Sequence, residues 1–408
     1  MFGTLPNSDW LGHSANGRAI AERPAGPQVR RWQRAPTRYS LIGSDRSGGD
    51  RMPSTAVSPH RIEGLDLLRG FAIVLVLLRH SWPQVFGGAG IVGVVVFFTL
   101  SGYLITGILV SDVRQHGRVR YGRFYRNRAI RLVPALAFLL VGFVIVEGVI
   151  DLIDTRDAVW RTVVLAATYT TNIPGLEPTS RSMTHLWTLA NEEQFYLVWP
   201  LLLVLGIRLR RLRAVVLGAA VVILVALAVT IVVHRDDLTF LYTLPTTWTI
   251  AMVIGAAARL AQVRLNRIIT ERRRPWVAGG AVAGLMVLVF IPDAKSSLIV
   301  YAVGGVLIGA LTVALIWYLR TIPTVPSIAK PLLGLGVISY AAYLWNYPVT
   351  FWVRDLAPNS WPWIAPIVTI GLATVSWFLV ERPFNRFKAR VTHPTAKHQG
   401  LAASPSRS

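Results

Sequence analysis

The chain has 408 residues, of which 53% are hydrophobic and only 15% are charged. Soluble globular proteins carry about 25% charged residues, so this balance excludes an ordinary soluble domain. The net charge of +22 raises nucleic acid as a partner, but the arginines lie in short connections between apolar blocks, as the positive-inside rule describes. We therefore expect no nucleic-acid partner. Cysteine is absent, which excludes disulfides and a cysteinyl thioester intermediate.

Composition divides the chain into three regions. Residues 1–60 are rich in Pro, Gly, Ser and Arg, lack apolar periodicity and are predicted to form a disordered cytoplasmic tail. They contain no apolar core of a cleavable signal peptide. Residues 61–388 are predicted to form one transmembrane domain, and residues 389–408 a second disordered cytoplasmic tail.

The apolar blocks have the length of helices that cross about 30 Å of hydrocarbon. The fold class expected is all-α, a polytopic membrane protein with ten transmembrane helices. In chain order these helices are predicted at residues 65–82, 90–110, 131–150, 193–207, 213–233, 241–262, 275–291, 297–318, 332–352 and 363–380.

A further apolar stretch, residues 158–172, is ambiguous by length alone. If it does not cross, the arginine-rich and arginine-poor connections alternate along the whole chain, with both termini cytoplasmic. If it crosses, every later arginine-rich connection lies outside. We therefore predict an interfacial or re-entrant segment on the outer face, in a multi-pass protein of the bacterial plasma membrane.

Charged residues inside the first predicted helix are the first indication of a site. Arg69 and His80 are eleven residues apart, which places them within about 20° on one helix face and about 16 Å apart along the axis. Asp66 lies one turn from Arg69 and can pair with it. Ionisable residues inside a membrane usually face a bundle interior or a polar cavity, so we expect a functional polar face. Arg79 is expected to extend to the interface instead.

Six stretches carry a resemblance to a known family, and they occur in the family's order. The first helix, with LDLLRGFAIVLVLLRH, is similar to that of the integral membrane acyltransferase family 3. Four further regions resemble its motifs: GVVVFFTLSGYLITG (93–107), FYRNRAIRLVPAL (124–136), HLWTLANEEQFYLVWP (185–200), and the late pair ISYAAYLWNYPV (338–349) and VERPFNR (380–386). The resemblance covers about residues 61–388.

The chain departs from the family pattern at a few positions. Asn346 stands where many members have histidine, which puts a proton role there in doubt. Thr188 and Ala190 replace serines, and Asn191 precedes the two glutamates of the fourth motif.

The resemblance implies transfer of an acyl group, often acetyl, from a cytoplasmic thioester to a hydroxyl, typically on a carbohydrate of the cell surface. Acyl-CoA, and acetyl-CoA in particular, is expected as a co-substrate, with no permanently bound cofactor and no metal site. Arg128 and Arg131 form the family's R-x-x-R motif, and guanidinium forks suit phosphate. We assign Arg128, Arg131 and Asp66 to donor binding, and Arg69 to the catalytic set.

His80 is the expected general base, since an imidazole, whose usual pKa is about 6.5, can take a proton from a hydroxyl at neutral pH. Glu192 is the expected carboxylate that orients it, whereas Glu193 is interpreted as an exposed acid at a helix N-terminus. His185 is interpreted as an interfacial histidine. Ser101, beside Gly102, is interpreted as part of a close helix contact rather than as a nucleophile.

Two other classes of function remain open from the sequence. A transporter or flippase of an envelope lipid or sugar also fits ten helices with buried charge, and a membrane subunit that only binds partners is the third possibility. The acceptor is left open among polysaccharide, glycolipid and peptidoglycan sugars. The expected partners are therefore the acyl donor, a carbohydrate or glycolipid acceptor and the lipid bilayer.

Overall fold

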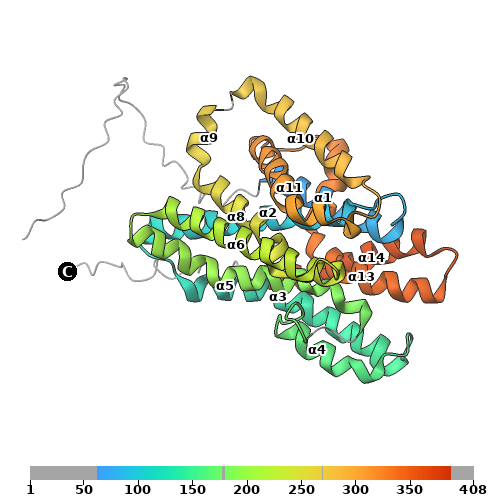
Figure 1. Ribbon diagram of the computed structural model, residues 1–408. Helices are drawn as coiled ribbons and strands as arrows, with labels where there is room; N and C mark the ends of the chain where they lie inside the picture. The colour runs from blue at the N-terminus through green and yellow to red at the C-terminus, as the bar shows by residue number, and fades with distance from the viewer. Residues whose placement is uncertain (1–61, 177–179, 269, 387–408) are drawn as a thin grey trace, which may run out of the picture. The chain divides into compact units, whose positions relative to one another are not determined.

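The computed structural model describes residues 62–176, 180–268 and 270–386 (Figure 1). All regular structure in these residues is helical, as the composition predicts. The two tails, predicted as disordered at 1–60 and 389–408, lie outside the described residues. The elements are, in chain order, α1 (Glu63–Ser81), α2 (Ala89–His116), α3 (Tyr121–Phe143), a π-helix (Val144–Ile150), α4 (Val159–Ala167), α5 (Trp187–Arg208), α6 (Leu212–His234), α7 (Leu238–Thr243), α8 (Pro245–Leu260), α9 (Gln262–Ile268), α10 (Arg274–Val289), α11 (Leu298–Leu319), α12 (Lys330–Val337), α13 (Ser339–Leu356), α14 (Trp361–Ser376) and a second π-helix (Trp377–Glu381).

Short 3-10 turns occupy several connections between these helices. Three of them matter for the site: Arg156–Ala158 before α4, Arg181–Leu186 before α5, and Ala294–Ser296 between α10 and α11. The remaining two that precede helices are Glu271–Arg273 and Ser327–Ala329.

Each of the ten predicted apolar segments is helical, but the count of ten crossings is not confirmed. Among the described residues six helices are long and apolar enough to span a membrane, and a seventh is counted if α12 and α13, bent by 68°, form one broken span. The helix α10 has only 16 residues, and α1 carries several charged side chains, so neither meets the same test. The chain is a multi-pass helical membrane protein.

Two helices begin earlier than predicted, and this changes where their polar residues lie. The helix α3 begins at Tyr121 rather than at residue 131, so Arg128 and Arg131 lie inside a helix and not in a loop. The helix α5 begins at Trp187 rather than at residue 193. Apolar length locates only the most hydrophobic part of a span, and both helices extend beyond it with polar residues that face other helices.

The ambiguous stretch at 158–172 contains α4, a helix of nine residues. A helix of nine residues is about 14 Å long, too short to cross a bilayer. Its side of the membrane stays a prediction.

The helix α2 forms the centre of the bundle, where it packs against α1, α5, α8, α10 and α11. At its contact with α8 the two backbones touch through glycines. A Cβ on Gly102 would collide with the carbonyl oxygen of Met252, and a Cβ on Gly255 with that of Thr99. The sequence interpretation of Gly102 as a close helix contact is confirmed. Gly70 and Gly336 give the same backbone contact between α1 and α12.

The outer helix α6 contrasts with this core. Only 6% of its most apolar stretch is buried by the rest of the protein. Leucine and valine side chains on its surface therefore face outward, as expected for contact with lipid.

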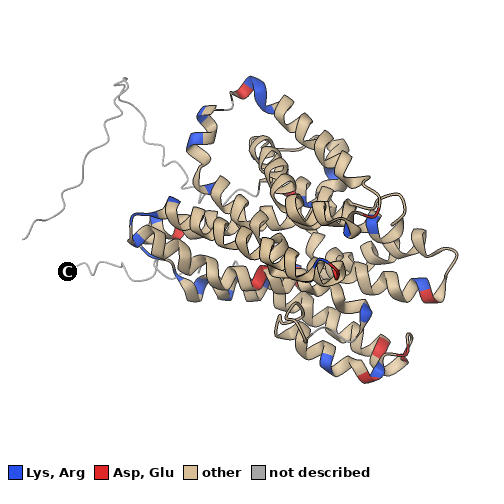
Figure 2. Cartoon of the chain, viewed as in Figure 1, with Lys and Arg blue, Asp and Glu red and all other residues tan. Residues whose placement is uncertain are grey.

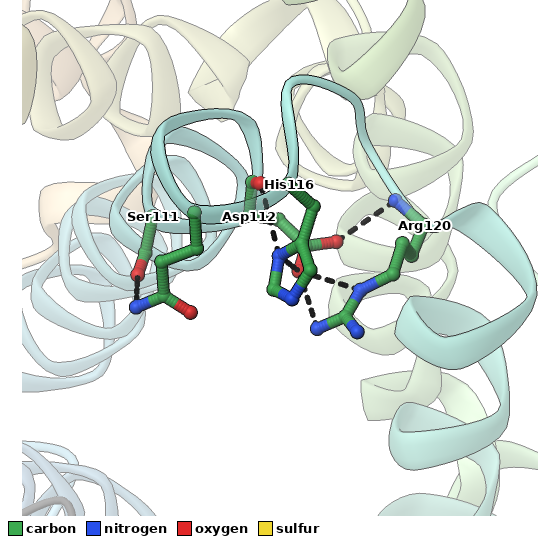
Figure 3. A network of polar contacts seen from close by, with 5 residues as sticks. Ser111, Asp112, His116 and Arg120 are labelled. Atoms are coloured by element: carbon green, nitrogen blue, oxygen red, sulfur yellow. Dashed lines mark hydrogen bonds and ion pairs between the residues drawn. The ribbon is translucent and has the colours of Figure 1, made fainter.

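The turn between α2 and α3 is fixed by one carboxylate (Figure 3). Asp112 accepts hydrogen bonds from the backbone nitrogen of Arg120 at 2.8 Å and from its Nε at 3.1 Å, and the His116 ring lies on the other side of the same carboxylate. Gly117, with φ of 70°, ends α2 in the left-handed region that glycine favours. This turn sets the start of α3, and hence the position of its arginines.

Charge is unevenly distributed over the helix ends (Figure 2). Lys and Arg gather at the turn between α5 and α6, where Arg208, Arg210, Arg211 and Arg213 are exposed or half-buried. Acidic residues gather at the tip of the connection between α3 and α4, which carries Asp151, Asp154 and Asp157.

We predict that Gly255→Ala destabilises the protein by about 1–3 kcal/mol, because the added methyl group meets the backbone of α2 and the helices have to separate. Thermal unfolding of the purified protein in detergent measures this. Gly218→Ala on α6 is the matched control, since nothing lies within 4 Å of its Cβ position. We expect its stability to stay equal or to rise by up to about 1 kcal/mol. Equal unfolding temperatures for the two variants would contradict the close α2–α8 contact.

Candidate active site

Two cavities lie along α1, one at each end. We name the first the arginine cavity, since Arg69, Arg128 and Arg131 line it together with Ser101 and Glu192; its volume is about 150 Å³. Apolar residues form most of the rest of its wall, among them Val94, Phe97, Phe98, Leu104, Ile105, Ile108, Leu132 and Leu189. The sequence predicted that Arg69, Arg128, Arg131 and Glu192 are functional residues, and the structure brings these four together.

The guanidinium of Arg69 is held by Asp66, as the sequence predicts. The distance from Nη1 of Arg69 to Oδ1 of Asp66 is 2.7 Å, and Asp66 is only 2% exposed. Asp66 does not line the arginine cavity, because its carboxylate points to Arg69 on the neighbouring turn. Donor binding by Asp66 stays a prediction, and the contact that the structure shows is the ion pair that positions Arg69.

Arg128 is fixed from two sides. Its Nε donates a hydrogen bond of 2.9 Å to Oε1 of Glu193, and its guanidinium lies 3.3 Å above the centre of the Tyr196 ring. The interpretation of Glu193 as an exposed acid at a helix N-terminus is wrong, because α5 begins at Trp187 and Glu193 lies nearly two turns inside it. Arg131, one turn further along α3, lines the same cavity, and no ion pair to it occurs among the described residues.

Glu192 lies in the arginine cavity and not beside His80. The hydroxyl of Ser101 donates a hydrogen bond of 2.5 Å to Oε1 of Glu192, which joins α2 to α5. The expectation that Glu192 orients His80 is therefore wrong. The early start of α5 is the reason, since it moves this carboxylate along the helix toward Arg128.

We name the second cavity the histidine cavity, because His80 and His185 both line it; its volume is about 440 Å³. Its other lining residues come from four separate connections and helix ends, and include Gly90, Thr184, Asp237, Thr239, Thr243, Lys295 and Tyr347. His80 is thus at the end of α1 opposite Arg69, with access to an enclosed space, as the sequence predicts.

The partner of His80 is Asn346 on α13, whose Oδ1 forms a short hydrogen bond with Nδ1 of the imidazole. A carbonyl oxygen only accepts hydrogen bonds, so this contact places the proton on Nδ1 and leaves the lone pair on Nε2. The Tyr347 ring packs edge-on against the imidazole at 4.9 Å between centroids. Asn346 is thus a site residue. In the sequence it was notable only because many family members have histidine at this position.

His185 is buried, with 6% of its surface exposed, so the interpretation of it as an interfacial histidine is wrong. Its Nε2 lies 3.1 Å from the carbonyl oxygen of Leu344, a contact that places the proton on Nε2. Its Nδ1 is buried without a hydrogen-bond partner in the described part of the chain. Two rings of α13, Tyr343 and Tyr347, pack on either side, at 5.6 Å and 5.3 Å between centroids.

Two residues, Val94 and Tyr343, line both cavities and so form the wall between them. The hydroxyl of Tyr343 donates to the carbonyl oxygen of His185 at 3.0 Å and accepts from the hydroxyl of Thr188 at 2.7 Å. The single polar stripe predicted from Arg69 to His80 is thus divided into two chambers.

A buried carboxylate holds the segment that carries His185. Glu147, with none of its surface exposed, lies in the π-helix that continues α3. It accepts hydrogen bonds from the hydroxyls of Thr155 (2.7 Å), Ser180 (2.6 Å) and Ser182 (2.5 Å), and from Nε1 of Trp352 (2.9 Å). Four donors satisfy this carboxylate, which ties the 3-10 turn before α5 to α3 and α13.

Among the described residues no group of three or more His, Asp or Glu side chains is arranged to hold a metal ion. The site consists instead of paired arginines in one chamber and imidazoles in the other. The first can bind an anion, and the second can exchange a proton with a hydroxyl group.

The structure is that of a multi-pass helical membrane protein with two cavities inside its bundle. A family model described as an acyltransferase domain matches residues 62–381, and the chain belongs to that family. The resemblance predicted from the motifs is confirmed.

Among similar proteins, the O-acetyltransferase OatA of Staphylococcus aureus (strain MRSA252) is 30% identical over 379 residues, covering 84% of this chain and 60% of that one. The peptidoglycan O-acetyltransferase OatA of Listeria monocytogenes (serovar 1/2a) is 27% identical over 366 residues, 82% of this chain and 57% of that one. The chain thus spans about 60% of the length of these relatives. No solved structure matches it significantly.

We predict that Glu147→Gln lowers the stability of the outer connection by about 1–3 kcal/mol, because one acceptor oxygen becomes an amide group that faces hydroxyl donors. Limited trypsin digestion should then cut faster at Arg156, Arg161 and Arg181, which are exposed around this segment. The matched control is Asp157→Asn, an exposed carboxylate of the same connection. If both variants resist trypsin like the unaltered protein, Glu147 does not hold this segment.

Proposed function

We propose that this protein transfers an acetyl group from acetyl-CoA, bound on the cytoplasmic side, to a hydroxyl of a cell-envelope carbohydrate. Membership of the acyltransferase family supports the reaction class. The relatives that are named peptidoglycan O-acetyltransferases support acetyl as the group and a wall sugar as the acceptor. The observation that carries the proposal is the wall shared by the arginine cavity and the histidine cavity.

The arginine cavity is the proposed donor site. Its three guanidinium groups match the phosphates of coenzyme A, for which arginine forks supply both charge and paired hydrogen bonds. Its other walls are mainly apolar and suit the uncharged pantetheine arm. The exposed arginines between α5 and α6, together with the positive-inside rule, support a cytoplasmic position for this end of the bundle.

The histidine cavity is the proposed acceptor site. In the reaction, Nε2 of His80 takes the proton of the acceptor hydroxyl as its oxygen attacks the thioester carbonyl carbon. A carbon–oxygen bond forms and the carbon–sulfur bond breaks. The imidazolium then returns the proton to the leaving thiolate, which leaves as coenzyme A. The hydrogen bond of Nδ1 to Asn346 keeps Nε2 free for this step.

The shared wall determines where the transfer takes place. The acetyl thioester has to reach Val94 and Tyr343 from the arginine cavity, while the acceptor hydroxyl reaches them from the histidine cavity. The distance of about 16 Å between Arg69 and His80 along α1 is the span that the pantetheine arm has to bridge. A transporter, in contrast, would move its substrate without any donor and form no new ester.

We predict that His80→Ala lowers acetyl transfer by at least about a hundredfold while the protein stays folded, because the variant loses the Nε2 that takes the proton in the proposed step. Asn346→Ala should lower kcat more than it changes KM, since the imidazole keeps its place but loses its fixed tautomer. Purified protein, radiolabelled acetyl-CoA and a set of envelope sugars provide the assay. His116→Ala, at the end of α2 outside both cavities, is the control. Full activity of His80→Ala would remove His80 from the chemistry.

We predict that Arg131→Gln raises KM for acetyl-CoA about tenfold with little change in kcat, because one charge-assisted contact to phosphate is lost. The effect should disappear with S-acetyl-N-acetylcysteamine, a thioester that lacks the nucleotide and the phosphates. Arg114→Gln, exposed near the end of α2, is the matched control. An equal loss with both donors would mean that Arg131 does not contact the phosphates of the donor.

A further inference from the structure

Lys295 is a charged residue of the histidine cavity that the proposed reaction does not use. It lies in the 3-10 turn between α10 and α11, where Asp293, with φ of 42°, reverses the backbone. The hydroxyl of Tyr301 donates a hydrogen bond of 2.6 Å to the carbonyl oxygen of Lys295 and fixes the turn. The ammonium group lies 4.1 Å from the centre of the Tyr242 ring, which directs it along the cavity wall.

A second cation lies close to the same cavity. The side chain of Arg79 packs its Cγ against Gly90, which lines the histidine cavity, and the Nε of Arg79 is buried without a hydrogen-bond partner in the described residues. Arg79 was expected to extend to the membrane interface. Part of its side chain is instead buried beside the histidine cavity.

Negative charge does not balance these two cations. Asp237 is the one acid among the residues that line this cavity, and its Oδ1 caps α7 by accepting from the backbone nitrogen of Phe240 at 2.9 Å. No ion pair to Lys295 or Arg79 occurs in the part of the chain that the structure describes. The lining residues thus carry one cation, Lys295, and one acid, Asp237, and Arg79 adds a second cation behind Gly90.

The surroundings of Lys295 disfavour its charge as long as the cavity holds no anion. Burial, together with repulsion from Arg79, lowers the pKa of Lys295 to about 8. The ammonium form still predominates at neutral pH. A bound anion would reverse both effects, because it replaces lost hydration and offsets the repulsion.

We propose that Lys295, supported by Arg79, forms a subsite of the histidine cavity for an anionic group, a carboxylate or a phosphate, carried by the sugar that accepts the acyl group. This inference rests on the proposed function in that it takes the histidine cavity as the acceptor site. His80 and Lys295 line the same cavity, so one acceptor would present its hydroxyl to the first and its anionic group to the second. The subsite would select charged sugars over neutral ones.

The test compares acceptors that differ only in charge. N-acetylmuramic acid carries a carboxylate that its methyl ester lacks, and N-acetylglucosamine 1-phosphate carries a phosphate that N-acetylglucosamine lacks. Binding to the full-length protein in detergent, measured by titration calorimetry without any donor, should favour the charged member of at least one pair by about tenfold. The pair that shows the preference identifies the anion. Equal affinity within both pairs would overturn the proposal.

Variants then test whether Lys295 causes the preference for charged sugars. Lys295→Met should remove the preference for the charged sugar and leave the affinity for the neutral one unchanged, whereas Lys295→Arg should keep the preference. Lys330→Met, an exposed residue at the start of α12, removes the same charge elsewhere and is the matched control. If Lys295→Met keeps the preference, or if Lys330→Met loses it equally, Lys295 is not the subsite. Should Lys295→Met fail to fold, the Lys295→Arg variant and the comparison of sugars on the unaltered protein still test whether an anion subsite exists.

Measuring sugar binding and acetyl transfer separately distinguishes the proposed reaction from the proposed anion subsite. A charge preference in binding without any transfer from acetyl-CoA would contradict the proposed reaction and retain the anion subsite. Transfer with equal affinity for charged and neutral sugars would retain the reaction and refute the subsite.

Discussion

The arrangement of this protein depends on how charge is tolerated inside an apolar helix bundle. A guanidinium in such surroundings is stable when a carboxylate, an aromatic face or water satisfies it. Arg69 has Asp66 on its own helix, and Arg128 has Glu193 and the ring of Tyr196 on α5. These pairs make the charges tolerable, and the pairs of Arg128 also join α3 to α5. The arginine cavity is therefore a product of the same contacts that allow its residues to be there.

Close helix contacts give the second constraint. Backbone meets backbone where α2 crosses α8 and where α1 crosses α12, so the helices that line the cavities have little freedom to shift. One helix, α13, lines both cavities along its length. Ser339 and Tyr340 begin α13 at the arginine cavity, and Tyr347, two turns later, lies in the histidine cavity beside His80.

The sequence predicted the helical class, the positions of the apolar segments and the family, because apolar length and short motifs are local signals. It also predicted the Asp66–Arg69 pair, which depends only on helix periodicity. It misplaced Glu192 and Glu193, because the start of α5 depends on polar residues that are stable only against other helices. The positions of Asn346, Tyr343 and Lys295 beside the cavities required the packing of distant segments, and no spacing in the chain indicates that α13 and the turn at Lys295 lie near the end of α1.

The wall of Val94 and Tyr343 also has a consequence for the bilayer. A continuous aqueous passage through a cell membrane would dissipate its proton and ion gradients. Here Val94 and Tyr343 lie between the two cavities, and the Tyr343 hydroxyl is hydrogen-bonded to the carbonyl oxygen of His185 and to the Thr188 hydroxyl. Because side chains separate the two cavities, the protein can hold ionisable groups at both ends of α1 and still leave the bilayer electrically insulating.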